Sequence, residues 1–247
     1  MEDRDISNQI ERLETEIVRL REESQLKNGW IALISHNFKG TFSNLISLIE
    51  AQEQGSISEA DFFNLLPQIK HDAANNLQLI NDTAVWRKTQ LEGYESQPSE
   101  FDVVELYDTL KEGFEEKLSK KNLRVIYHGT ESLKIYTDRS LIAFVLERII
   151  DNAIKYSHPG GVVTMTAETD QEGISLTIID RGIGMNQNQL NSIFTFDAPV
   201  YRGTHGETGV GLSLIIARYF VSLMQSEFEI ESSEQEGTTV RIKLPHK

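Results

Sequence analysis

The sequence of 247 residues contains no cysteine. Disulfides, thiolate catalysis and cysteine-ligated zinc or iron–sulfur sites are therefore excluded. No apolar run approaches the roughly 18–20 residues that cross a membrane, since the longest covers only residues 141–146. The charged N-terminus also lacks the apolar core of a secretory signal. We therefore expect a cytoplasmic segment without membrane contact of its own, either alone or as the cytoplasmic part of a larger, membrane-anchored receptor.

Basic residues are scarce relative to acidic ones, because 24 Lys and Arg against 38 Asp and Glu give a formal charge of −14. Such a surface repels nucleic acids and anionic lipids, so we expect no nucleic-acid partner. Hydrophobic residues make up 39% of the chain, which is enough for a sizeable core and excludes global disorder. The length predicts one large domain or two ordinary ones.

Residues 6–38 carry a heptad pattern. Apolar residues alternate spacings of three and four, and the frame resumes after a polar break at Ser24 and Lys27: Ile10, Leu13, Ile17, Leu20, Ile31, Ile34 and Phe38. The pattern predicts a coiled coil over residues 1–27 that continues as one helix to about Gln52. A coiled-coil seam needs a partner, so we expect a homodimer; the alternative is an amphipathic surface helix of a monomer.

A second helix is expected after a short turn. Gly55 suits the end of the first helix, and Ser58 with Asp61 resembles a capping box for the next. Apolar residues at spacings of three and four over residues 62–84 predict that second helix, which Pro67 should bend. Residues 28–92 are thus predicted to form an antiparallel helical hairpin, which gives a four-helix bundle when it dimerises.

A polar stretch at residues 93–100 is the predicted linker to a second domain, residues 101–247. Helices and strands mix in this domain, with neighbouring strands that read as hairpins. We expect helices at 103–121, 140–156 and 209–224, and strands at 123–127, 162–168, 174–179, 227–232 and 238–244. This order predicts an α+β sandwich of one mixed sheet with helices on one face.

Two clusters in this domain carry potential chemistry. Asn152 and Lys155 share one face at the end of a predicted helix, where an amide oxygen suits Mg²⁺ and a lysine can meet phosphate. Asp180 directly follows a predicted strand and can accept from an exocyclic amine, while Gly182 and Gly184 let the backbone pass close to a ligand. Taken singly, the first cluster is equally typical of a solvated helix end, and the second is equally typical of a glycine turn after a strand.

A third cluster is the glycine-rich stretch at residues 203–212, which is expected to open a helix. Free N–H groups at a helix start, with glycines that allow close approach, make a phosphate site. No Gly-Lys-Ser/Thr follows, so this is not a Walker A loop, and no strand closely precedes it, as a dinucleotide-binding fingerprint requires. The alternative is a flexible loop.

The order and spacing of the three clusters resemble the sensor histidine kinases of two-component systems, within the GHKL ATPase superfamily. The resemblance covers the chain from about residue 28 to the end. The stretch around Asn152 resembles the N box and Asp180-x-Gly182-x-Gly184 resembles the G1 box. The F and G2 boxes are matched by Phe194, Phe196, Gly209, Gly211 and Leu212. The implied fold is a dimeric helical bundle followed by an α+β sandwich of the GHKL ATPase type.

The stretch Ile34-Ser-His-Asn-Phe-Lys39 resembles the H box of this family, in which a histidine takes phosphate from ATP. The heptad frame places His36 at the outer f position, where its side chain stays exposed to solvent. Neutral imidazole is a competent nucleophile.

The resemblance implies ATP and Mg²⁺ as cofactors, and a response regulator receiver domain as the partner that accepts the phosphoryl group from His36 on an aspartate. Asp180 would accept from the adenine amine and Asn152 would hold Mg²⁺. The remaining implied contacts are phosphate neutralisation by Lys155 and Arg202, backbone N–H groups at Gly209 and Gly211, packing of Tyr156 near the base, and a mobile lid over residues 186–207.

The sequence departs from the family pattern near the phosphoacceptor and in the N box. Asn37 replaces the usual acidic residue and could only orient the imidazole ring, and Gly40 and Thr41 replace residues linked to dephosphorylation and to a helix kink. Arg148 replaces the first N-box asparagine, and Ser226-Glu227 replaces a glycine pair. These departures keep open a catalytically weak, nucleotide-binding dimeric scaffold. A topoisomerase-like ATPase clamp is disfavoured because a transducer domain is missing and an H box is present.

Overall fold

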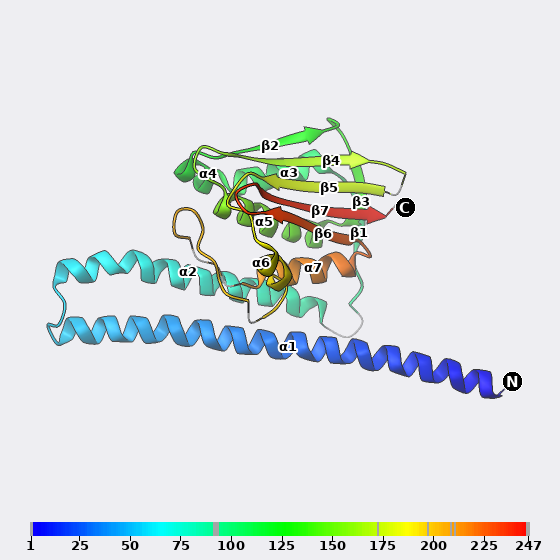
Figure 1. Cartoon of the computed structure of the whole chain (residues 1–247), viewed down its shortest axis with the longest axis horizontal. Coiled ribbons are helices and arrows are strands. Elements are labelled where there is room, and N and C mark those ends of the chain that lie inside the picture. Colours follow the sequence, from blue (N-terminus) through cyan, green and yellow to red (C-terminus); the bar gives the residue numbers. More distant parts are fainter. Residues whose placement is uncertain are drawn as a thin grey trace. The chain divides into compact units, whose positions relative to one another are not determined.

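The computed structural model describes residues 2–90, 94–171, 173–196, 198–207, 209 and 211–245, and divides the chain into two compact units, Met1–Leu79 and Ile80–Lys247 (Figure 1). Each unit is described separately. The end of the predicted hairpin, residues 91–92, and the first residue of the predicted linker, residue 93, lie outside the described residues. The last three residues of the linker belong to a strand. Within the described residues, every helix is too short or too polar to cross a membrane.

The first unit is built from two helices, as the periodicity predicts. Helix α1 spans Glu2–Glu53, and helix α2 spans Glu59–Thr89 and continues into the second unit. The turn between them uses Gly55 in a left-handed conformation (φ 66°). Ser58 then receives the backbone N–H of Asp61 at 3.1 Å, so the predicted cap is present. Pro67 lies within α2.

Four heptad positions on α1, Ile10, Leu13, Ile17 and Ile31, are exposed in the single chain, while Ile34 and Phe38 are half-buried. Leu13 is 63% exposed and Ile31 is 64% exposed, although both belong to the apolar seam. Further along the same helix, Phe42, Ile46 and Ile49 are also exposed. In a dimer these side chains would be covered by the second chain. Their exposure in a single chain is therefore consistent with a dimeric coiled coil and bundle.

The second unit contains a five-stranded mixed sheet in the order β2-β4-β5-β7-β6. Strand β2 pairs in parallel with β4, and the other pairings are antiparallel. The strands are β2 (Arg124–Gly129), β4 (Val162–Thr169), β5 (Gly173–Asp180), β6 (Glu227–Ser233) and β7 (Gly237–Pro245). The predicted mixed sheet is therefore present, and all five predicted strands belong to it.

A second, two-stranded sheet, which the sequence pattern did not predict, pairs β1 (Pro98–Asp102) with β3 (Lys134–Asp138). Strand β1 is mostly exposed, and both strands are only five residues long, so the sequence gives little sign of them. The helix predicted over residues 103–121 is also divided in two. It consists of α3 (Val103–Gly113) and α4 (Glu115–Lys121), because Phe114 leaves the helical conformation after Gly113 and is buried.

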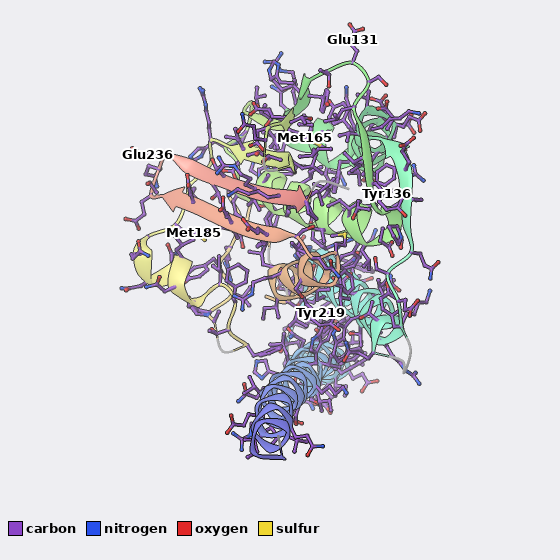
Figure 2. All side chains as sticks on the ribbon, turned by 90° about the vertical axis from the view of Figure 1, so that its right-hand side faces the viewer. Glu131, Tyr136, Met165, Met185, Tyr219 and Glu236 are labelled. Atoms are coloured by element: carbon purple, nitrogen blue, oxygen red, sulfur yellow. The ribbon has the colours of Figure 1, made fainter. Side chains whose placement is uncertain are left out.

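The core lies between the sheet and the helices α5 (Arg139–Tyr156) and α7 (Ser213–Leu223), which cover the same face of the sheet (Figure 1). Alternate residues of β4 point into this core, and Met165 is fully buried there (Figure 2). Phe144 of α5 and Phe220 of α7 meet edge to face with ring centroids 5.0 Å apart. This packing fixes the position of α5, which carries the N-box residues, and of α7, which follows the glycine-rich stretch.

Asp138 caps the N-terminus of α5 and also binds the backbone of the segment that precedes β1. Its carboxylate accepts the N–H groups of Ser140 at 3.0 Å and Leu141 at 3.2 Å, as an N-cap does. The other oxygen accepts from the backbone of Gln97 at 2.8 Å. Burial alone would raise the pKa of Asp138, but these hydrogen bonds and that of the Ser140 hydroxyl lower it overall.

We expect Asp138→Ala to lower the free energy of opening of α5 by about 2 kcal/mol, because a cap and the buried acceptor of Gln97 are lost together. Hydrogen–deuterium exchange of the amides in residues 139–156 measures this loss. Asp108→Ala, at an exposed position of α3, is the matched control and should leave α5 unchanged. Equal protection of α5 in both variants would contradict the capping role.

Candidate nucleotide-binding site

A cavity of about 250 Å³ opens between the end of α5, the turn after β5 and the start of α7. Most of the residues predicted to bind nucleotide line it: Asn152, Lys155, Tyr156, Asp180, Gly184, Arg202, Gly209 and Gly211. The lining also includes residues that the sequence did not single out, among them Ile149, Ile178, Met185, Val200 and Thr238. Gly182 and Leu212, both predicted as binding residues, are not part of the lining and act through the backbone around it.

Asp180 is the buried acceptor of the cavity. It ends β5 and is only 7% exposed. Burial raises the pKa of its carboxyl to about 6, although hydrogen bonds from the backbone of Gly182 and Thr238 act in the opposite direction. One carboxylate oxygen accepts the Gly182 N–H at 2.9 Å, which fixes the side chain in place. A fixed carboxylate among apolar side chains recognises a hydrogen-bond donor on a flat, largely apolar ligand.

The two glycines after Asp180 are required by the protein itself. A Cβ on Gly182 would lie 2.2 Å from the carbonyl oxygen of Tyr156, and one on Gly184 would lie 1.8 Å from that of Ser233. Gly184 also has a positive φ of 59°. Close approach of three backbone segments therefore requires glycine at both positions, and the predicted approach to a ligand stays a prediction.

The hairpin between β6 and β7 completes this wall of the cavity, and sequence reasoning did not assign it a role. The Ser232 hydroxyl receives the N–H of Met185 at 2.9 Å and donates to the carbonyl of Gly237 at 2.8 Å. Gln235 N–H donates to the carbonyl of Ile183 at 2.8 Å. Figure 2 shows Glu236 at the hairpin tip and Met185 near α6 on the same side of the domain. The Glu236-Gly237 pair was the only sequence signal, and it indicated no more than a turn.

Lys155 supplies the positive charge of the cavity. Its ammonium lies 4.7 Å from the centroid of the Tyr156 ring, and a Cβ on Gly209 would come within 2.7 Å of its Nζ. Burial lowers the pKa of Lys155 to about 8, although Asp151 and Glu207 raise it. Lys155 is therefore partly desolvated and lies beside the glycine-rich stretch, where it can bind an anionic group of a ligand.

Tyr156 closes the cavity next to Lys155. Its hydroxyl donates to the carbonyl of Tyr201 at 3.2 Å, and burial raises its pKa to about 12. The phenol is thus a neutral hydrogen-bond donor, and its ring forms an apolar surface at the cavity.

The glycine-rich stretch does not itself form the start of a helix. Helix α7 begins at Ser213, later than the predicted residue 209, and Leu212 precedes it without a side-chain cap. Ser213 and Leu214 line the cavity, so the first turn of α7 faces it with N–H groups that have no helical acceptor. Thr208 and Val210, within the same stretch, lie outside the described residues.

The predicted lid over residues 186–207 contains a short helix, α6 (Gln187–Ser192), which Asn186 and Gln189 cap reciprocally. After it, Phe194 packs against Phe228 with centroids 6.0 Å apart, while the Arg218 guanidinium lies 4.6 Å from its ring. Phe196 is half-buried. The start of the predicted lid is therefore regular structure packed on the domain, and the segment from Ala198 to Arg202 lines the cavity.

His36 and Asn37 lie in the first unit. His36 is exposed on α1, as the f position predicts. Asn37 directs its amide nitrogen to the carbonyl of Leu33 at 2.9 Å, one turn back along its own helix. This contact ties the Asn37 side chain to the helix backbone, which argues against the predicted role in orienting the histidine ring.

Arg148, the departure from the N-box pattern, is buried and engages acidic groups instead of the cavity. Its guanidinium lies 3.9 Å from Asp82 and 2.5 Å from Glu147, and 5.2 Å from the ring of Phe144. The substitution therefore affects the packing of α5 on residues 80–90 more directly than the nucleotide cavity.

Residues 137–247 match the family described as histidine kinase-, DNA gyrase B- and HSP90-like ATPase, which binds ATP. Curated relatives are sensor kinases. Histidine kinase P4 of Formosa agariphila is 25% identical over 232 residues, which are 92% of this chain and 17% of the relative. The sensor histidine kinase WalK of Bacillus subtilis is 26% identical over 231 residues, 90% of this chain and 37% of the relative. The chain thus spans well under half the length of these relatives.

Solved histidine kinase structures share the fold. The Acinetobacter baumannii histidine kinase AdeS matches 85% of this chain and 97% of its own, with a TM-score of 0.66 and 20% identity. Histidine kinase ThkA, solved in complex with the response regulator protein TrrA, matches 87% of this chain and 60% of its own, with a TM-score of 0.68 and 17% identity. The chain is thus similar to sensor histidine kinases over nearly its whole length, and it shares the fold of these solved kinases.

We expect the affinity of the chain for ATP to fall above pH 8. Lys155 must be protonated to attract phosphate, and with a pKa of about 8 it loses its proton in this range, so the affinity should approach a tenfold loss per pH unit. The phosphate groups of ATP are fully ionised well below this pH and do not confound the measurement. Calorimetric titration from pH 7.5 to 9.5 measures the effect.

Lys155→Arg is the control for this titration, because a guanidinium keeps its charge over the whole range. Its ATP affinity should therefore be flat with pH. A flat profile in the unchanged chain as well would show that Lys155 does not contact phosphate.

Proposed function

We propose that the chain is an ATP-dependent protein histidine kinase that autophosphorylates His36 and passes the phosphoryl group to an aspartate of a response regulator. The observation that carries the proposal is the composition of the cavity lining. It combines a buried carboxylate, Asp180, and apolar side chains with Lys155, which lies beside Gly209, and with the first turn of α7. A base beside the carboxylate and phosphates beside the lysine fit this lining.

Adenine is the base that Asp180 favours. The carboxylate is an acceptor at pH 7, because its pKa of about 6 lies below neutrality. The exocyclic amine of adenine is a donor, whereas the corresponding position of guanine carries a carbonyl oxygen that the carboxylate would repel. Apolar lining from Ile149, Ile178 and Val240 would pack on the faces of the ring.

The phosphates would meet Lys155, the backbone around Gly209 and Gly211, and Arg202 at the exposed rim. No group of three or more acidic or histidine side chains gathers as a metal site in the described part of the chain. Such a cavity fits Mg²⁺ that is held mainly by the nucleotide, with the amide oxygen of Asn152 as the protein ligand. When bound, Mg²⁺ neutralises phosphate charge.

His36 would be the nucleophile. An imidazole nitrogen forms a bond to the γ-phosphorus while the bond from that phosphorus to the β,γ-bridging oxygen breaks and ADP leaves. The histidine must lose its ring proton afterwards, and Asn37 cannot accept it, because an amide is not a base at this pH. Solvent access to the exposed His36 supplies a route for that proton. Catalysis therefore depends mostly on positioning and charge neutralisation.

A homodimer is part of the proposal. The exposed apolar seam of residues 1–27 would form the coiled coil, and the hairpin at residues 28–92 would form the four-helix bundle. A receiver domain would dock near His36 to take its phosphate. The complex of ThkA with TrrA, which shares this fold, supports a response regulator as the partner.

A second candidate is a nucleotide-binding dimeric scaffold with weak catalysis, which regulates a partner by conformation. The side-chain contact of Asn37 with Leu33 favours it, because the residue beside the phosphoacceptor takes no part in proton transfer. Both candidates bind ATP, and only the first labels His36.

Incubation with γ-labelled ATP and Mg²⁺ separates the two. We expect acid-labile, alkali-stable phosphate on the chain, lost in His36→Ala and kept in His71→Ala, which changes the other histidine of the helical unit. ATP binding without label in the unchanged chain would favour the scaffold.

Asp180→Asn should weaken ATP binding at least about a hundredfold, because the amide nitrogen would face the adenine amine donor to donor. Asp170→Asn, in the turn after β4, is the control, since the amide oxygen can still accept from Gly173. Tight ATP binding by Asp180→Asn would show that adenine is bound elsewhere.

A further inference from the structure

Lys121, at the end of α4, is a buried lysine that belongs to none of the motifs. Its residue is 3% exposed. An ammonium is costly to bury unless all its N–H groups find acceptors. Here its Nζ reaches three acceptors, the carbonyls of Ile154 at 2.8 Å and Lys155 at 2.7 Å and the carboxylate of Glu207 at 2.8 Å. The three acceptors match the three donors of the ammonium.

Two of these acceptors belong to the last turn of α5. Carbonyls at a helix C-terminus lack intrahelical donors and carry partial negative charge, so a buried cation stabilises that end. The same turn holds Lys155, whose side chain enters the cavity. Lys121 therefore fixes the backbone from which Lys155 extends.

The third acceptor, Glu207, belongs to a folded turn at residues 203–207. The N–H of Gly203 donates to the Glu207 carbonyl at 2.7 Å, and the N–H of His205 donates to the second carboxylate oxygen at 2.8 Å. Thr204 joins this turn to α5 through its N–H, which donates to the Lys155 carbonyl at 3.1 Å. One carboxylate oxygen of Glu207 thus accepts a hydrogen bond within its own turn, and the other accepts one from Lys121.

Glu207 also acts on Lys155. The two side chains are neighbours, because a Cβ on Gly203 would lie 2.4 Å from Glu207 Oε2 and 2.7 Å from Lys155 Cγ. The charge of Glu207 raises the pKa of Lys155, which burial lowers. Burial would raise the pKa of Glu207, but the hydrogen bond from Lys121 and those from the backbone lower it overall. Glu207 is therefore ionised, and its charge is balanced by Lys121.

We propose that Lys121 and Glu207 form an ion pair at the end of α5, in which Lys121 neutralises the Glu207 carboxylate and so keeps Lys155 available for the phosphates of the nucleotide. The inference rests on the proposed binding of ATP. Without Lys121, the carboxylate of Glu207 is an unbalanced anion beside Lys155 and competes with phosphate for it. Removing both members of the pair leaves the local charge unchanged.

The experiment compares ATP and adenosine affinities by calorimetric titration of the full chain. Lys121→Met should weaken ATP binding about tenfold and leave adenosine binding within twofold, because adenosine carries no phosphate. The double variant Lys121→Met/Glu207→Gln should recover ATP affinity to within threefold of the unchanged chain. Lys120→Met is the control, because it removes the same charge from an exposed neighbour that pairs only along α4 with Glu116.

ATP affinity unchanged in Lys121→Met, or a double variant as weak as Lys121→Met alone, would overturn the pair while the proposed function stands. Failure of the unchanged chain to bind ATP would overturn the proposed function and the pair together. If circular dichroism shows that Lys121→Met does not fold, Glu207→Gln decides. ATP affinity at least threefold tighter than that of the unchanged chain, with adenosine affinity unchanged, supports the pair, and an unchanged or weaker ATP affinity overturns it.

Discussion

The backbone that follows β5 runs between two carbonyl groups, that of Tyr156 at the end of α5 and that of Ser233 at the end of β6. The contacts leave no space for a side chain at Gly182 or Gly184, and they hold Asp180 at the base of the cavity. The position of the buried acceptor therefore depends on backbone contacts among three segments that are far apart in sequence. The apolar lining and the cationic end of the cavity are arranged around this fixed point.

Sequence patterns predicted the elements that repeat and missed those that depend on distant contacts. The long periodic runs of α1 and α5 and the alternating strands of the large sheet were predicted nearly to their ends, because periodicity reports burial directly. Strand β1 was missed because it is short and mostly exposed, and its partner β3 lies more than 30 residues away in the sequence. The break at Phe114 was also missed, since a buried aromatic residue fits a helical pattern equally well.

The predicted site shows the same division. Asp180, Asn152 and Lys155 could be predicted because their spacing matches a known order of motifs, and they do line one cavity. Lys121 and Ser232 could not, because nothing in their neighbourhoods in the sequence distinguishes them from surface residues. Their roles arise from partners more than 30 residues and nearly 50 residues away, respectively. Asn37 illustrates the converse case, in which a residue matched to a motif position binds its own helix.

The hairpin formed by Ser232 to Gly237 has a consequence for the order of events during synthesis. The turn after Asp180 is hydrogen-bonded to this hairpin, because Met185 N–H donates to Ser232 and Gln235 N–H donates to the Ile183 carbonyl. Gly237 lies so close to the Asp180 backbone that no side chain would fit there. A nascent chain that has emerged only as far as α7 therefore has all the recognisable motifs but lacks one wall of its cavity. Only translation through β7, whose Thr238 and Val240 also line the cavity, completes this wall, long after His36 has left the ribosome.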